Sequence, residues 1–162
     1  MSVIEATKPL GEVPTLRAAR ADDLPAVERL LTASDLPVVG VADAIMTFVV
    51  AEHRGEVVGV AGLELCCDNG LLRSVAVAPA WQRQGLARAL VSRVIAEAEE
   101  RRLHAMYLLT TTAAHYFPKF GFAETTRASV PADVAATEEF KSACPASAVV
   151  MVRPIADERV GR

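Results

Sequence analysis

The chain has 162 residues, of which 52% are hydrophobic and 23% are charged. This length and apolar content suit one domain with a packed core, and they exclude an intrinsically disordered chain. The formal net charge of −3 disfavours a nucleic acid or an anionic membrane as partner, and no apolar run approaches the ~20 residues of a membrane-spanning helix.

The N-terminal residues lack the basic and then apolar pattern of a secretory signal, and we therefore expect a cytoplasmic protein. Three cysteines and three histidines show no metal-ligand spacing, so we expect no metal site. Residues 1–14 are predicted to form a loose tail, 15–153 the single domain and 154–162 a C-terminal tail.

Hydrophobic periodicity interleaves strands with helices and shows no internal repeat. Asp22 is expected to cap the first helix, and Asp68-Asn69-Gly70 is a turn pattern that joins two strands into a hairpin. A polar segment at 130–145 is a candidate lid. The predicted strands are 15–19, 48–52, 57–67, 71–78, 106–110, one from 122, and 148–152. The predicted helices are 21–31, a turn at 41–46, a long helix that ends near 102, and a short one at 113–119.

The segment 82–87, Gln-Arg-Gln-Gly-Leu-Ala, starts the long helix without a Ser, Thr, Asp or Asn to cap it. A helix start leaves about four N–H groups unpaired and carries roughly half a positive charge. Gly85 lacks the Cβ that would block a close approach, and Arg83 and Arg88 add positive charge. These features suit a bound phosphate or pyrophosphate, but they also suit a helix capped by water, because short glycine patterns are weak signals.

Val-x-Pro at 77–79, followed by Gln82-x-x-Gly85-x-Ala87, resembles the Q/R-x-x-G-x-G/A signature of the GNAT acetyltransferase superfamily. The predicted element order matches that superfamily, and "HYFPKFGF" at 115–122 resembles its second marker. The resemblance implies a single α/β domain with a mixed, mostly antiparallel twisted sheet, flanked by helices and with splayed central strands. It also implies acetyl-CoA as cosubstrate.

The resemblance further implies how acetyl-CoA binds. The strand edge at 75–77 would pair with the amide arm, as a peptide added to a sheet does, and backbone N–H groups at 82–87 would hold the pyrophosphate. Lys119 would reach a phosphate or would simply favour the negative end of its short helix. The expected cofactor-binding residues are Val75, Ala76, Val77, Gln82, Arg83, Gln84, Gly85, Leu86, Ala87, Arg88, Phe117 and Lys119.

Residues 108–122 and 130–151 resemble the arsenic-resistance N-acetyltransferases, a bacterial subgroup of the superfamily. This resemblance implies direct acetyl transfer to the amine of a small molecule, an amino acid or its arsenic or phosphinic analogue. Two alternatives stay open, a protein or peptide N-acetyltransferase and a non-catalytic module that senses acyl-CoA. The expected partner is a small-molecule amine, and a homodimer is left open.

Glu64 and Arg73 are the candidate residues of the acceptor side. Glu64 is the only acid inside the predicted hairpin strands, where burial would raise its pKa and suit it as general base. Arg73 in an apolar strand has a fork that suits a carboxylate or arsinate, with Ser74 as an accessory in substrate binding. The alternatives are a plain cross-strand pair of Glu64 with Arg73 or Ser74, or exposure of Arg73.

Tyr116 is the second catalytic candidate. The superfamily's frequent tyrosine, which protonates the departing thiolate, aligns with Phe117, and the hydroxyl here lies one residue earlier. One step along a helix rotates a side chain by about 100°, so Tyr116 is either a general acid or a packing residue.

Overall fold

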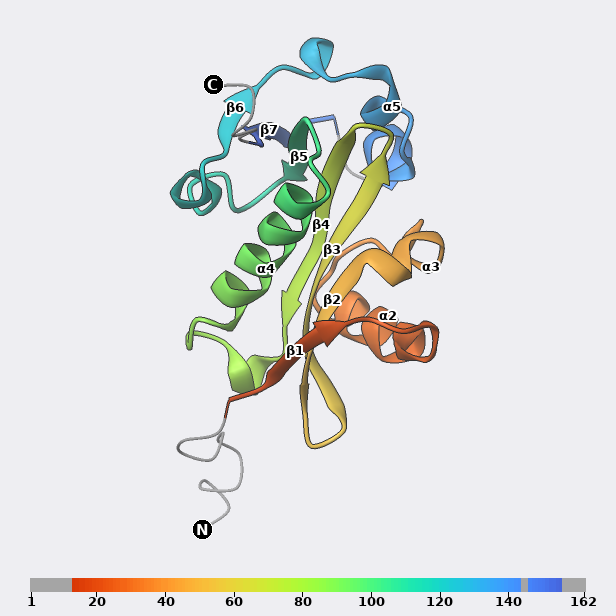
Figure 1. The fold of residues 1–162 in the computed structure, drawn as a ribbon, viewed down its shortest axis with the longest axis vertical. Helices are drawn as coiled ribbons and strands as arrows, with labels where there is room; N and C mark the ends of the chain where they lie inside the picture. Colours follow the sequence, from red (N-terminus) through yellow and green to blue (C-terminus); the bar gives the residue numbers. More distant parts are fainter. Residues whose placement is uncertain (1–12, 144–145, 156–162) are drawn as a thin grey trace.

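A seven-stranded sheet forms the centre of the computed structural model, which describes residues 13–143 and 146–155 (Figure 1). The strand order is β1-β2-β3-β4-β5-β7-β6, and the β4–β5 pair is parallel while the other neighbours are antiparallel. The predicted fold class is thereby confirmed. The strands are β1 (Thr15–Ala18), β2 (Phe48–His53), β3 (Glu56–Cys66), β4 (Asn69–Val77), β5 (Ala105–Thr110), β6 (Ala123–Thr125) and β7 (Val149–Pro154).

Helices cover both faces of the sheet, with α4 on one face and α2 and α3 on the other (Figure 1). The helices are α2 (Leu24–Ala33), α3 (Val41–Ala44), α4 (Leu86–Glu100) and α5 (Ala132–Ala135). Short turns are η1 (Ala21–Asp23), η2 (Ile45–Thr47), η3 (Pro79–Trp81), η4 (Phe117–Phe120), η5 (Arg127–Ser129) and the π-helical η6 (Glu139–Ala143). Spacings of three and four residues place six apolar side chains of α4 on one buried side, as predicted. They are Leu86, Leu90, Val91, Val94, Ile95 and Ala98.

Strands β4 and β5 pair over three residues only, from Asn69 opposite Ala105 to Leu71 opposite Tyr107. Beyond Leu71 no strand of the described residues pairs with this edge of β4. The central strands therefore diverge, as the family resemblance implied.

The opposite edge of β4 carries a bulge against β3. Val60 pairs with Ala76 and Gly62 with Arg73, so one residue of β3 faces two of β4 between these pairs. Ser74 in the bulge has a φ of +61°, in the left-handed region that residues other than glycine rarely adopt. A bulge turns the side chains and backbone groups that flank it away from the regular strand pattern.

The turn between β3 and β4 lies earlier than the 68–70 pattern predicted. Cys66 pairs with Asn69, so residues 67 and 68 form the turn, and Cys67 has a φ of +56°. Gly70 belongs to β4, where a Cβ would meet leucine side chains at 2.7 and 2.9 Å. Close packing against the sheet, rather than the turn, requires glycine at this position.

The predicted cap at Asp22 is wrong, because Asp22 is exposed and lies within η1. Asp23 is the buried acid, and its carboxylate accepts hydrogen bonds from the Arg17 guanidinium at 2.8 and 3.0 Å and from the Arg20 backbone N–H at 2.7 Å. The bond from Arg17, opposed by burial, lowers the pKa of Asp23 to about 2.

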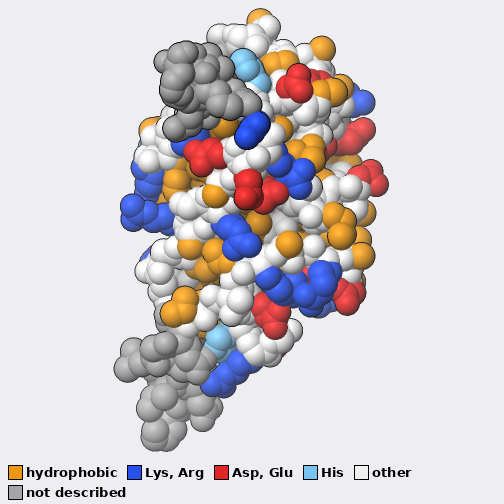
Figure 2. Space-filling view, in the orientation of Figure 1, with side chains coloured by type: hydrophobic (Ala, Val, Ile, Leu, Met, Phe, Trp, Pro, Cys, Tyr) orange, Lys and Arg blue, Asp and Glu red, His pale blue; other side chains and the backbone are white. Residues whose placement is uncertain are grey.

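Charged side chains of both signs are interspersed over the face in Figure 2, without a broad basic field. Within the described ranges, no helix combines the length and the apolar content that a bilayer crossing requires. The predicted tails fall almost entirely outside these ranges.

Candidate active site

A cavity of about 320 Å³ lies between β4 and β5, where their pairing ends. Its walls come from both strands, from the loop after β5, from the loop before α3 and from the excursion between β6 and β7. The cavity thus exists because β4 and β5 diverge after their three paired residues. The lining residues are 35–37, 72–75, 108–113, Tyr116, Phe117 and Glu139.

Helix α4 starts without a side-chain cap, as the sequence predicted. Its first backbone bond runs from the Ala89 N–H to the Gly85 carbonyl at 3.0 Å, so the N–H groups of Leu86, Ala87 and Arg88 have no partner within the helix. Gly85 has a φ of +82°, and a Cβ there would meet no atom within 4 Å. Unpaired donors, the positive end of the helix and open space together fit a phosphate group.

The side chain of Gln82 shapes this helix start instead of facing outward as a ligand group. Its Nε2 donates to the Val77 carbonyl at 2.9 Å, which joins the end of β4 to the loop. Its backbone N–H donates to the Pro79 carbonyl at 3.3 Å. Gln84 also bonds within the loop, to the Ala80 carbonyl at 3.3 Å. Both the side-chain and the backbone N–H donors of Gln82 are thus engaged within the protein. The backbone N–H groups that can bind a phosphate lie after Gln82 in the chain.

Tyr116 and Phe117 of the second marker both line the cavity, although they are adjacent in sequence. The Tyr116 ring packs against Phe117 and Phe120, with centroids 5.2 and 5.4 Å apart. The Lys119 Nζ lies 4.2 Å from the centroid of the Tyr116 ring, a cation–π contact. The expected short helix is a single 3₁₀ turn that begins at Phe117.

Burial raises the pKa of Tyr116 above its ordinary value of 10.0, against a smaller opposing effect of Arg88. The tyrosine therefore keeps its proton at neutral pH. Of the predicted cofactor residues, Val75 and Phe117 line the cavity, and the segment 82–88 is not part of its lining.

Arg73 is fully buried beside the bulge, so the exposed alternative is wrong. Its Nε donates to Ser74 Oγ at 3.1 Å, its Nη1 to Glu64 Oε1 at 2.9 Å, and its Nη2 to the Val39 carbonyl at 2.7 Å. Glu139 Oε1 lies 3.3 Å from the same Nη2. A buried guanidinium requires such partners, because an unpaired buried charge is strongly destabilising.

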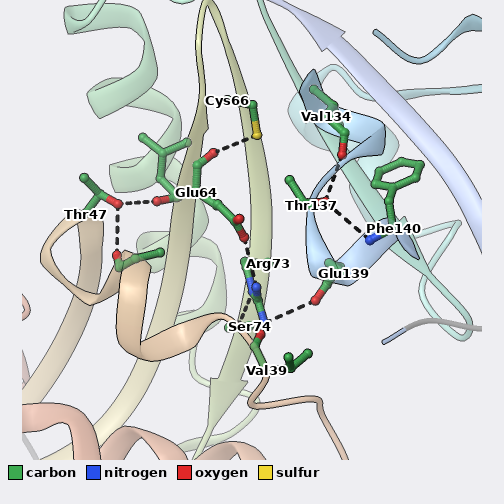
Figure 3. Close-up of polar contacts among 12 residues, drawn as sticks. Val39, Thr47, Glu64, Cys66, Arg73, Ser74, Val134, Thr137, Glu139 and Phe140 are labelled. Carbon is green, nitrogen blue, oxygen red and sulfur yellow. Dashed lines mark hydrogen bonds and ion pairs between the residues drawn. The ribbon is translucent and has the colours of Figure 1, made fainter. Parts of the chain in front are cut away.

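Arg73 lies between Glu64 and Glu139 (Figure 3). The cross-strand pair, which was the alternative for Glu64, is confirmed. Glu64 does not line the cavity, and it borders a separate depression beside α3. The cavity instead has the buried Glu139 and the exposed Asp35 as its acids. Glu139 is not among the predicted site residues, although it lies in the candidate lid segment at 130–145.

The excursion after β6 holds Glu139 in place through a small hydrogen-bonded turn. Thr137 Oγ1 donates to the Val134 carbonyl at 2.8 Å and accepts the Phe140 N–H at 3.3 Å. Val134 and Phe140 are buried against the sheet. Glu139 begins the π-helical turn η6. Such turns are rare in proteins as a whole, and those that occur are often at functional sites.

Comparison with known proteins agrees with this geometry. Residues 44–124 match the model of the acetyltransferase (GNAT) domain family. An amino-acid acetyltransferase of Mycobacterium tuberculosis is 34% identical over 131 residues, which are 75% of each chain.

Solved structures give the same result. A Mycobacterium tuberculosis protein solved with CoA has a TM-score of 0.74 and 28% identity, over 88% of this chain and all of that one. An N-acetylglutamate synthase from Neisseria gonorrhoeae, solved with CoA and N-acetyl-glutamate, has a TM-score of 0.76 and 21% identity, over 90% of this chain and 36% of that one. With the diverging strands and the uncapped helix start, these matches show that the chain belongs to the GNAT acetyltransferase family.

Proposed function

We propose that this acetyltransferase uses acetyl-CoA to acetylate the amino group of a free amino acid. The observation that carries the proposal is the cavity between β4 and β5, which has a buried arginine, Arg73, in its wall. The uncapped start of α4, which follows β4 in the chain, is the second feature that supports it. Relatives support it, since one is named an amino-acid acetyltransferase and another was solved with N-acetyl-glutamate.

The residues of this chain fit the cofactor. The first-turn N–H groups of α4 and the open space at Gly85 suit the pyrophosphate, and the exposed Arg83 and Arg88 add positive charge. The edge of β4 at 75–77 has no strand partner on its β5 side among the described residues, so its backbone groups suit the amide arm. Two of the solved relatives were crystallised with CoA.

When bound, acetyl-CoA would supply an activated acetyl thioester. Attack by a neutral amine would form the C–N bond, break the C–S bond, release one proton from the nitrogen to solvent and leave the sulfur to be protonated. An α-amine has a pKa near ~8, against ~10.4 for lysine, so a much larger fraction of it is neutral at pH 7 than of a lysine side chain. Tyr116 keeps its proton because burial raises its pKa, and it is in the cavity wall to give that proton to the leaving sulfur. Glu64 holds Arg73 in place from outside the cavity.

Arsenic- and phosphinate-containing amino acids are a second class of acceptor. They have the same head group as an ordinary amino acid, an amine and a carboxylate on one carbon. What favours them is that the segment resembling the arsenic-resistance enzymes, 130–151, includes the cavity residue Glu139.

A thiol-release assay tests the proposal with acetyl-CoA and a panel of amines. The panel comprises the common amino acids, phosphinothricin, an arsenic-containing amino acid and a peptide with a free N-terminus. We expect turnover of at least one free amino acid or analogue and none of the peptide. Turnover of the peptide alone, or acetyl-CoA binding without turnover of any amine, would contradict the proposal.

A further inference from the structure

We propose that the Arg73–Glu139 ion pair is the recognition site for a zwitterion. An α-amino acid would separate these two side chains on binding, with its carboxylate at Arg73 and its ammonium group at Glu139. The ammonium group would then lose one proton before it attacks the thioester. The inference rests on the proposed function and deepens it. It makes Glu139 a substrate-binding residue and the free α-carboxylate a required feature of the substrate.

Arg73 keeps its position when Glu139 is displaced, because its other contacts are shorter. The guanidinium is 2.7 to 3.1 Å from Val39, Glu64 and Ser74, but 3.3 Å from Glu139. The same Nη2 that faces Glu139 remains bonded to the Val39 carbonyl. Separation of the pair therefore leaves a fixed guanidinium, and its Nη2 can then donate to a carboxylate that takes the place of Glu139.

The charges of the cluster favour a zwitterion over a simple anion or cation. One guanidinium lies among two carboxylates, so the cluster carries a net negative charge that opposes a simple anion. A simple cation would pair with Glu139 but would provide no negative group to replace Glu139 at Arg73. An amino acid replaces one ion pair by two and leaves the net charge unchanged. Because the cluster is buried, each of these pairs is stronger than it would be in water.

The two partners belong to parts of the fold that differ in how they are held. Arg73 is in β4, at the bulge, where strand pairing fixes its backbone. Glu139 is at the start of η6, which lies outside the sheet (Figures 1 and 3). Movement of this short turn separates the pair without disturbing the sheet. Entry of the substrate thus requires displacement of Glu139 only.

The test compares Glu139→Gln with Glu138→Gln. Glu138 is an exposed neighbour whose carboxylate pairs with Lys141 at 3.7 Å, so it is a matched control on the same segment. The probes are L-glutamate and L-glutamine, each against its α-carboxamide, in which the carboxylate is blocked. Calorimetry in the presence of CoA measures binding, and steady-state assays with acetyl-CoA measure turnover.

For the wild type we expect the carboxamides to bind at least about tenfold more weakly than the free amino acids, a loss of one ion pair. Glu139→Gln should raise the Kd and KM of the free amino acids about tenfold. Its acetyl-CoA affinity and melting temperature should stay unchanged, and Glu139→Asp should recover part of the loss. Glu138→Gln should behave as wild type.

Equal binding of free amino acids and carboxamides, binding of neither amino acid, or equal behaviour of the two glutamine variants would overturn the inference. The proposed function fails in a different way, by absence of amine turnover in the wild type. The calorimetric comparison of the variants decides the role of Glu139 independently of that result.

Discussion

The two halves of the site along β4 are built in different ways. Toward the end of the strand, the cofactor half consists of backbone groups, the free edge at 75–77 and the uncapped start of α4. At the bulge, the acceptor half consists of side chains, with Arg73 held by Glu64 and Glu139 from separate elements. A backbone site depends on a short local pattern and tolerates changes of side chain. A side-chain cluster depends on tertiary structure and can differ among relatives that keep the same cofactor half.

The largest expected effect concerns Tyr116, in the wall of the cavity that Arg73 and Val75 also line. Tyr116→Phe removes the proton donor and should lower kcat about 100-fold, with little change in either KM. Wild-type kcat should fall as pH rises above 10, because the pKa of Tyr116 is raised and only the protonated form donates. That alkaline decline should be absent in the variant.

Tyr107→Phe is the matched control for this change. Tyr107 is also buried and its pKa is also raised by burial, but it lies outside the cavity. Its variant should retain wild-type kcat. Equal loss of kcat in both variants would indicate a general disturbance of the core instead of a proton donor.

The cofactor half is tested by Gly85→Val. A Cβ in the open space beside the helix start would obstruct a phosphate, and acetyl-CoA affinity should fall about 10- to 100-fold. Equilibrium binding measures this effect, and the Kd of the amine should stay unchanged.

Gly55→Val separates the obstruction from backbone strain. Gly55 in the β2–β3 turn has the same φ of +82° and likewise no atom within 4 Å of a Cβ. A valine is strained equally at both positions, so both variants should lose similar stability. Loss of acetyl-CoA affinity in Gly55→Val would remove the assignment of the phosphate site.

The acceptor half is tested by Arg73→Lys. Lysine keeps the charge but lacks the fork that reaches Glu64, Ser74 and a carboxylate together, so the KM of the amino acid should rise about tenfold. The KM of acetyl-CoA should not change. An unaltered KM for the amino acid would exclude Arg73 from substrate binding.

The smallest effect on activity is expected away from both halves, at Asp23. Asp23→Asn should reduce the free energy of unfolding by about 1–3 kcal/mol at neutral pH, because the bonds from Arg17 are weakened. The pKa of Asp23 is about 2 when folded, so its stabilisation is complete above ~4 and is lost as pH falls toward 2. Denaturant unfolding at pH 7 and pH 2.5 measures this loss, and the exposed Asp22 provides the control variant Asp22→Asn.

Features that depend on a local sequence pattern could be predicted, and features that depend on tertiary contacts could not. The inward face of α4 and its missing cap are local patterns, and the structure confirms both. The turn at 68–70 was misplaced because contacts of Gly70 inside the sheet outweigh its turn propensity. Glu139 was missed because nothing local distinguishes it from Glu138. The tertiary structure of the segment between β6 and β7 distinguishes them: it buries Glu139 beside Arg73 and leaves Glu138 exposed.

Steady-state kinetics of Gly85→Val and Arg73→Lys, with both substrates varied, test whether the site is divided into a cofactor half and an acceptor half. We expect the KM of acetyl-CoA to rise in Gly85→Val only and the KM of the amino acid to rise in Arg73→Lys only. If both variants raise the same KM, the division of the site into a backbone cofactor half and a side-chain acceptor half is contradicted.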